Sequence, residues 1–128
     1  MDEKRAIRQL DIEKKAELLT GDGFWSTREC PDIGMPAAKM SDGPHGMRVQ
    51  EKAPNHLGIG ESYPATCFPT ASAVACSFNL PLCRTIGAKI ATEAASFGVS
   101  MILGPGLNIK RSPLCGRNFE YFSEAPYL

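Results

Sequence analysis

Residues 79–106, "NLPLCRTIGAKIATEAASFGVSMILGPG", carry the pattern that decides the fold. Apolar side chains recur every three or four positions through most of this stretch, as on one face of a helix: Leu82, Ile86, Ile90, Ala94 and Phe97. An apolar run, "VSMIL", follows at once and ends at the turn "GPG" of residues 104–106. Such a run is typical of a strand with both faces covered. The stretch therefore predicts one helix that leads directly into one strand.

The predicted helix has matching signals at both of its ends. Asn79 can cap its start, Pro81 is tolerated in the first turn, and Gly98 can adopt the left-handed conformation that ends many helices. A shorter helix, over residues 71–77, is expected just before it.

A second strand is predicted earlier in the chain, over residues 37–40, directly before the turn Asp42-Gly43-Pro44. Two strands joined by a helix are parallel neighbours, which defines an α/β class. Residues 20–36 and 50–69 are rich in glycine, proline and polar side chains, and we expect them to be loops. Because two strands alone do not make a stable sheet, we expect residues outside this sequence to complete it.

Both ends of the sequence contain helix signals. Ile12, Ala16 and Leu19 fall at helical spacing after Asp11, which predicts an N-terminal helix. Ser123 is a suitable N-cap for another helix, which would begin shortly before the sequence ends. A helix that short has no stability of its own. We therefore expect these 128 residues to be the front part of a longer protein.

Composition narrows the class of partner. The chain has 128 residues, 43% of them hydrophobic, which fits one globular domain. Fourteen basic and fourteen acidic side chains cancel, so nothing points to nucleic acid or to an anionic membrane. No apolar run is long enough to span a bilayer, and "MDEKRAIRQL" has no secretory signal core. His45 and His56 have no second metal ligand at a useful spacing, so no metal is expected.

Five cysteines, an odd number without a CxxC pair, indicate reduced thiols. We therefore expect a cytoplasmic protein.

Polar groups follow both predicted strands, and ligands of parallel α/β proteins bind at such strand ends. Asp42 follows the first strand, where it is either a cap or turn residue or a carboxylate that accepts hydrogen bonds from a ligand. Arg117 stands in "GRNFEYF" after the second strand. It is either buried in an ion pair with Glu120 or presents its guanidinium to a ligand. These residues suggest a polar binding surface, and no nucleophile motif accompanies them.

Three stretches are specific enough to indicate a family: "KMSDGPHGMR" (39–48), "PATCFPTASAVACSFN" (64–79) and "LGPGLNIKRSPLCGRNFEYFSEAPYL" (103–128). They closely resemble the N-terminal domain of glycoside hydrolase family 3, the bacterial β-glucosidase group, and the resemblance runs from about Leu10 to Leu128. It implies a (β/α)8 barrel of the TIM type. Residues 1–128 would supply an N-terminal helix and roughly the first two βα units, and the rest of the barrel and a second domain would lie outside the sequence.

The resemblance also implies roles for single residues. Asp42 corresponds to the family aspartate that hydrogen-bonds hydroxyls of the sugar in the −1 subsite, and Arg117 to the arginine that does the same. Glu120 and the neighbouring rings would orient Arg117. Arg48 and His45 correspond to neighbours of that pocket.

The implied activity is that of a retaining β-glucosidase. It would release terminal β-D-glucosyl residues from β-glucosides or oligosaccharides, without metal or organic cofactor. The motifs of the family nucleophile and acid/base are absent from these 128 residues, so we expect the chain alone to be inactive. Two alternatives are a truncated or degenerate carbohydrate-binding protein and one half of a split enzyme, completed by the missing C-terminal part. Ala125 also departs from the family, which commonly has aspartate there.

Overall fold

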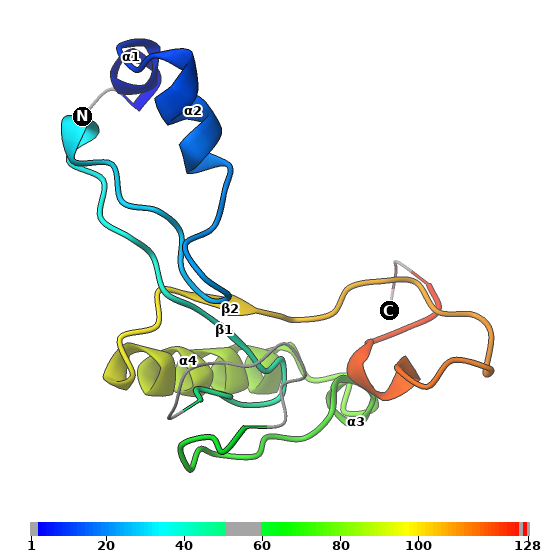
Figure 1. The fold of residues 1–128 in the computed structure, drawn as a ribbon. Coiled ribbons are helices and arrows are strands. Elements are labelled where there is room, and N and C mark those ends of the chain that lie inside the picture. Colours follow the sequence, from blue (N-terminus) through cyan, green and yellow to red (C-terminus); the bar gives the residue numbers. More distant parts are fainter. Residues whose placement is uncertain (1–2, 51–59, 126, 128) are drawn as a thin grey trace.

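The computed structural model describes residues 3–50, 60–125 and 127. Its elements in chain order are α1 (Glu3–Arg8), α2 (Ile12–Leu18), η1 (Pro31–Ile33), β1 (Met40–Asp42), α3 (Ala71–Ala75), α4 (Leu80–Ser96), β2 (Met101–Leu103) and η2 (Asn118–Glu120). The helices α1 and α2 stand apart from the remainder, in which α4 lies along one side of the two strands (Figure 1).

The long predicted helix is confirmed as α4. Asn79 caps it, with its Oδ1 accepting a hydrogen bond from the backbone N–H of Leu82 at 3.0 Å, and Pro81 lies in the first turn. Gly98 follows the helix with φ of 66°, in the left-handed region that glycine adopts without strain. The sequence signals at both ends therefore determine where α4 begins and ends.

The predicted strand–helix–strand unit and the α/β class are confirmed as well. Strands β1 and β2 pair in parallel, with Ser41 opposite Ile102 and Asp42 opposite Leu103. The position predicted for the first strand, residues 37–40, was wrong, because β1 begins at Met40. Residues just before it pair with a loop instead: Lys39 forms an antiparallel bridge with Ser26.

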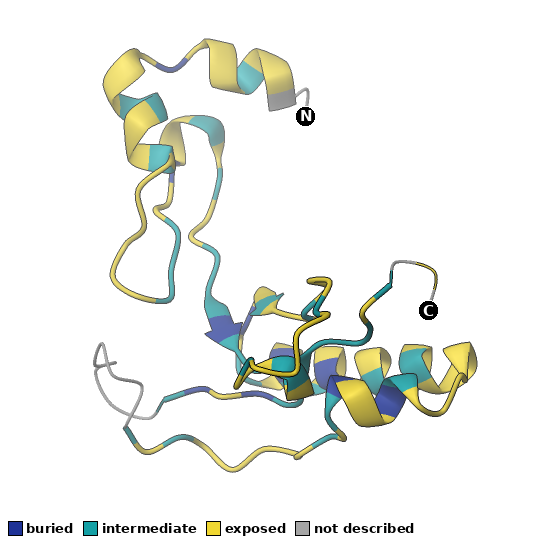
Figure 2. Ribbon diagram, turned by 90° about the vertical axis from the view of Figure 1, so that its right-hand side faces the viewer, coloured by how far each residue is buried: buried dark blue, intermediate teal, exposed yellow. Residues whose placement is uncertain are grey.

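Helix α4 covers only one face of the sheet. Its residues Ile90 and Ala94 form a buried cluster with Met47, Val49 and Val99, against which Ile102 packs. Buried residues accordingly concentrate around the sheet and α4, whereas the N-terminal helices are largely exposed (Figure 2).

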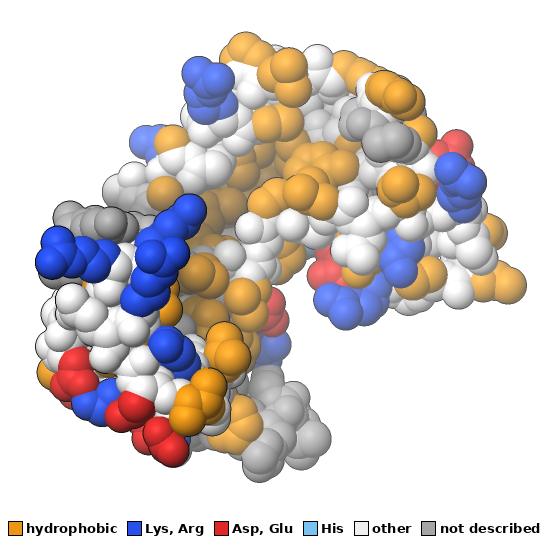
Figure 3. Space-filling model, turned by 90° about the horizontal axis from the view of Figure 1, so that it is seen from above, with side chains coloured by type: hydrophobic (Ala, Val, Ile, Leu, Met, Phe, Trp, Pro, Cys, Tyr) orange, Lys and Arg blue, Asp and Glu red, His pale blue; other side chains and the backbone are white. Residues whose placement is uncertain are grey.

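Within the described residues, only one face of the second strand is covered. Met101 is 52% exposed and Leu103 is 47% exposed, on the face opposite α4. Viewed from above, hydrophobic side chains line the hollow in the middle of the molecule (Figure 3). The described residues thus leave one face of the two-stranded sheet open.

Further segments extend the sheet at both edges without forming strands. Beside β1, the N–H of Arg48 donates to the carbonyl of Asp42 at 3.2 Å, and the N–H of Met40 donates to the carbonyl of Trp25 at 2.6 Å. Beyond β2, Gly106 and Tyr121 form a parallel bridge. This bridge brings the segment after Arg117 next to the end of β2.

The N-terminal helix predicted after Asp11 is confirmed as α2, whose cap is the Asp11 carboxylate, accepting from the N–H of Lys14 at 2.8 Å. Helix α1 was not predicted. Lys14 forms an ion pair with Asp32, which ties α2 to η1 inside the predicted loop 20–36.

The remaining predictions are met in part. Helix α3 is two residues shorter than the expected 71–77. In the loop predicted over 50–69, residues 51–59, including His56, lie outside the described residues. Ser123 accepts a hydrogen bond from the N–H of Ala125 at 3.0 Å, as a cap would, but residues 126 and 128 of the expected helix are also outside that set. Among the described residues, no helix has the length and apolarity needed to cross a membrane.

The cap of α4 generates a stability prediction. Replacing Asn79 by alanine removes the side-chain acceptor of the Leu82 N–H, and we expect the free energy of unfolding to fall by about 1 kcal/mol. Urea denaturation followed by circular dichroism measures this change.

Gly87→Ala in the same helix is the matched control of opposite sign. Nothing lies within 4 Å of the added Cβ, and alanine is favoured over glycine in a helix by about 0.5–1 kcal/mol. We expect Gly87→Ala to stabilise the chain. An unchanged midpoint in Asn79→Ala would show that α4 does not depend on this cap.

Candidate functional site

The site lies at the carboxyl end of β1. Side chains alternate between the two faces of a sheet, and Ser41, opposite Ile102, is buried on the side of α4. Ser41 donates its hydroxyl to the carbonyl of Arg48 at 3.1 Å. The next residue, Asp42, therefore presents its carboxylate on the face opposite α4, beside Leu103.

A local bond and a tight loop fix Asp42. Its Oδ1 accepts from the N–H of Gly43 at 2.9 Å, so the expected turn role is present, and it engages one of the two carboxylate oxygens. Gly43 and Gly46 have φ of 116° and 143°, a region that other residues avoid. A Cβ on Gly43 would lie 1.7 Å from the carbonyl oxygen of Gly46, and one on Gly46 would lie 2.2 Å from that of Thr66. These contacts leave the loop after Asp42 little freedom.

Arg117 combines features of both alternatives left open by the sequence. Its Nε donates to Oε1 of Glu120 across the short turn η2, so the ion pair exists. The arginine is not buried, however: its side chain is 73% exposed, whereas that of Glu120 is 13% exposed. Among the described residues, its guanidinium forms a hydrogen bond only with Glu120. The ion pair therefore orients Arg117 and leaves its terminal nitrogens facing solvent.

Electrostatics links these residues. The hydrogen bond and the charge of Glu120 raise the pKa of Arg117 above its usual value, and the charges of Tyr121 and Asp42 add to the rise. Conversely, the hydrogen bond from Arg117 lowers the pKa of Glu120, against the opposing effect of burial. Glu120 is thus the main electrostatic partner of Arg117, and the charge of Asp42 has the smallest of the named effects.

His45 connects the two loops that carry Asp42 and Arg117. Its Nε2 accepts a hydrogen bond from the N–H of Ala71 at 3.0 Å, at the start of α3. Its ring lies against that of Phe119 in η2, with centroids 5.9 Å apart. Ser72 of α3 in turn donates to the carbonyl of Phe119 at 3.4 Å. Because Nε2 is engaged in the fold, Nδ1 is the nitrogen that could contact a ligand.

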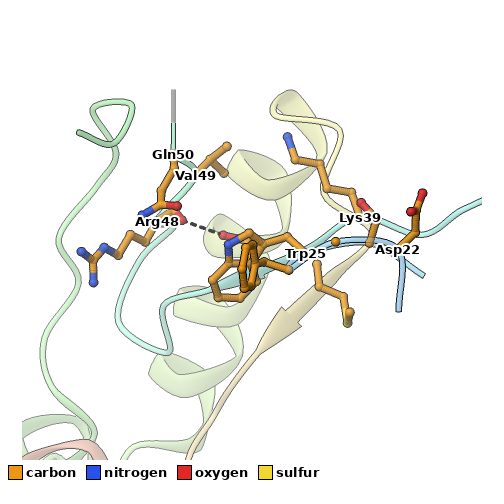
Figure 4. Close-up of a pocket in the computed structure, with 11 residues that line it drawn as sticks. Asp22, Trp25, Lys39, Arg48, Val49 and Gln50 are labelled. Atoms are coloured by element: carbon orange, nitrogen blue, oxygen red, sulfur yellow. Dashed lines mark hydrogen bonds between the residues drawn. The ribbon is translucent and has the colours of Figure 1, made fainter. Parts of the chain in front are cut away.

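Arg48 lies at the other edge of β1. Its backbone forms the antiparallel bridge with Asp42, and it lines a hollow of about 340 Å³ together with Trp25, Lys39 and Gln50. The guanidinium of Arg48 points away from Trp25 (Figure 4). The structure thus places the loops that carry Asp42, His45 and Arg117 at one tip of the sheet, and the Arg48 side chain beside a hollow at the other edge of β1.

Lys110, in the polar loop after the second strand, also lies at this site. Its Nζ lies 4.9 Å from the centroid of the Tyr121 ring, and its charge helps to lower the pKa of Glu120, after the stronger effects of Arg117 and His45. The path of the loop after β2 brings Lys110 here. Across residues 3–50 and 60–125, no three His, Cys, Asp or Glu side chains group as metal ligands, and the five cysteines are free thiols.

Comparison with known proteins places this geometry in a family. A sequence model described as the glycosyl hydrolase family 3 N terminal domain matches residues 32–128. The chain is 50% identical over 128 residues to the thermostable beta-glucosidase B of Acetivibrio thermocellus, covering all of this chain and 17% of that protein. It is 41% identical over 124 residues to an exo-alpha-(1->6)-L-arabinopyranosidase of Bifidobacterium longum, covering 96% of this chain and 16% of the relative.

Solved structures agree. The beta-glucosidase of Kluyveromyces marxianus in complex with glucose superposes with a TM-score of 0.86 at 35% identity, over 99% of this chain and 14% of that one. Beta-glucosidase 3B of Thermotoga neapolitana in complex with alpha-D-glucose gives 0.81 at 33% identity, over 97% and 19%. These matches define the class of the chain as a glycoside hydrolase domain. The chain belongs to glycosyl hydrolase family 3, as part of its N-terminal domain, and spans less than one fifth of the length of these relatives.

The coupling between Arg117 and Glu120 predicts a pH response. The pKa of Glu120 is lowered in the folded chain, so the ion pair stabilises the turn above the ordinary glutamate pKa of about 4.3. This stabilisation is lost as the pH falls through the lowered value. We expect Arg117→Gln to raise the pKa of Glu120, as followed by the chemical shift of its Cδ carbon.

Arg111→Gln is the matched control, because Arg111 is an exposed arginine of the same loop. The Glu120 pKa should be unchanged in that variant. The same titration curve for Glu120 in Arg117→Gln and in the unsubstituted chain would contradict the assigned ion pair.

Proposed function

We propose that this chain supplies sugar-binding groups of the −1 subsite of a retaining β-glucosidase. The observation that carries the proposal is that Asp42 and Arg117, far apart in the sequence, stand on loops at the ends of two paired parallel strands. His45 joins these loops through its contacts with Ala71 and Phe119. Both side chains have polar atoms that form no hydrogen bond within the described part of the chain.

The chemistry of this pair suits a pyranose. A carboxylate accepts hydrogen bonds from ring hydroxyls, and a guanidinium donates from two nitrogens held in a rigid plane. Charge-assisted hydrogen bonds of this kind are roughly twice as strong as neutral ones. The solved relatives in complex with glucose support a sugar ligand.

We further propose that residues 1–128 form the N-terminal portion of a (β/α)8 barrel domain. The parallel pair, the helix crossing between its strands and the bridge from Gly106 to Tyr121 support this architecture. The partner that completes the barrel would be the C-terminal part of the enzyme. His45 would support the pocket from α3, and Arg48 would contribute from the far edge of β1.

In this proposal the chain binds sugar but does not break the bond. A retaining glycosidase needs two carboxyl groups about 5 Å apart on either side of the glycosidic bond, and neither family motif for them is present here. Metal and organic cofactors have no part in this mechanism. The sugar itself is proposed to be glucose, although the name of the Bifidobacterium longum relative specifies L-arabinopyranose. Activity should therefore be measured on derivatives of both sugars.

A chimera tests the proposed binding groups. The 128 residues replace the aligned segment of the Acetivibrio thermocellus enzyme, and kcat/KM is measured with aryl β-D-glucoside and aryl α-L-arabinopyranoside. We expect Asp42→Asn and Arg117→Lys each to lower kcat/KM about 10- to 100-fold, since each removes hydrogen bonds between a charged group and the sugar. The 128-residue chain alone should hydrolyse neither substrate.

Asp22→Asn and Arg111→Lys are matched controls, exposed outside the site, and should leave kcat/KM unchanged. Variants of Asp42 and Arg117 that behave like these controls would refute the proposed roles. Turnover by the isolated chain would refute the absence of a reaction centre. If the arabinopyranoside is turned over faster than the glucoside, the proposed sugar is L-arabinopyranose and not glucose.

A further inference from the structure

Gly104, the first residue after β2, lies unusually close to the loop that carries Asp42. A Cβ on Gly104 would lie 2.8 Å from Cα of Pro44 and 2.9 Å from its Cβ. Carbon atoms in van der Waals contact lie about 3.5–4.0 Å apart, so any side chain here would push Pro44 away. Pro44 stands two positions after Asp42 in a loop that Gly43 and Gly46 already hold tightly.

Gly106 has the same relation to the turn that carries Arg117. A Cβ on Gly106 would lie 2.7 Å from the carbonyl oxygen of Glu120 and 3.0 Å from Cδ1 of Tyr121. Gly106 and Tyr121 also form the parallel bridge at this edge of the sheet. A side chain at Gly106 would therefore displace the backbone that follows Arg117.

Backbone conformation does not require a glycine at position 104 or at position 106. The described glycines with φ in the left-handed region are Gly23, Gly34, Gly43, Gly46 and Gly98. Gly104 and Gly106 are not among them, so an alanine could adopt their backbone angles. What excludes a side chain at both positions is the close approach of a neighbouring loop.

Residues 104–106 thus lie between two loops, with Pro44 against one end and Glu120-Tyr121 against the other. We propose that Gly104 and Gly106 are positioning residues that set the separation between the Asp42 carboxylate and the Arg117 guanidinium. The ligand in this inference, a pyranose whose ring hydroxyls reach both groups, rests on the proposed function. The separation itself does not, because it follows from the contacts of Gly104 and Gly106.

The size of the expected effect follows from how strongly reaction rates depend on the exact position of the groups that hold the substrate. A displacement of about 1 Å at a binding group can cost on the order of 100-fold in rate. An added methyl group at either glycine requires a shift approaching that size. We therefore expect Gly104→Ala and Gly106→Ala each to weaken sugar binding about tenfold or more.

The test uses NMR on the full 128-residue chain. One readout is the nuclear Overhauser contact between the rings of His45 and Phe119, which lie 5.9 Å apart and report on the gap between the two loops. A second readout is the dissociation constant of glucose from amide shifts. The matched control is Gly116→Ala, where the added Cβ meets nothing within 4 Å.

We expect the ring contact to persist in Gly116→Ala and to be lost in Gly104→Ala and Gly106→Ala, with glucose binding weakened only in the latter two. If both variants keep the contact and bind like Gly116→Ala, the inference is overturned. It is also overturned if the resonances of α4 collapse, because the glycines would then serve the whole fold. If the ring contact depends on Gly104 and Gly106 but the Asp42 and Arg117 variants of the chimera behave like their controls, the spacing stands and the proposed function fails.

Discussion

The parallel pairing of β1 with β2 is the constraint on which the rest of the structure depends. Its register sets Asp42 opposite Leu103, so both strands end at the same level and the loops after them leave from one edge. Helix α4 enforces this register from below, since Ile90 and Ala94 bury the side of the sheet that carries Ile102. A shift by one residue would turn Asp42 toward α4 and Ser41 away from it. The strand-tip site is therefore a consequence of how the core packs.

Around this edge, short-range contacts position two charged groups without burying them. Glu120 holds Arg117 by one nitrogen, and Asp42 is held by the N–H of Gly43, so each keeps further polar atoms that form no hydrogen bond within the described residues. A fully buried ion pair would have been costly to desolvate and closed to a ligand. His45, Phe119 and the start of α3 join the two loops from the other side. Orientation and accessibility are thus provided by different neighbours.

The sequence predicted best the features that depend on local chemistry. Helix α4 could be placed from its apolar periodicity, the Asn79 cap and Gly98, and the pairing of Arg117 with Glu120 followed from residues three apart on one turn. It failed where distant segments decide. Strand β1 begins later than predicted because Lys39 pairs with Ser26. Leu103 is exposed because the described residues cover only the opposite face of the sheet. Three further features depend on tertiary contacts and have no local signal in the sequence. They are the hydrogen bond of His45 to the start of α3, the contact of Lys110 with the Tyr121 ring and the close approach of Gly104 to Pro44.

The central claim is that Asp42 and Arg117 hold one sugar together, and a double-mutant cycle tests it most directly. The cycle is measured in the chimera with the Acetivibrio thermocellus enzyme, from kcat/KM of the aryl β-D-glucoside for Asp42→Ala, Arg117→Ala and the double variant. Residues that share one hydrogen-bonding network couple by about 0.5–3 kcal/mol, whereas distant residues add within about 0.5 kcal/mol. The account predicts clear coupling between the two residues. Purely additive losses would contradict it.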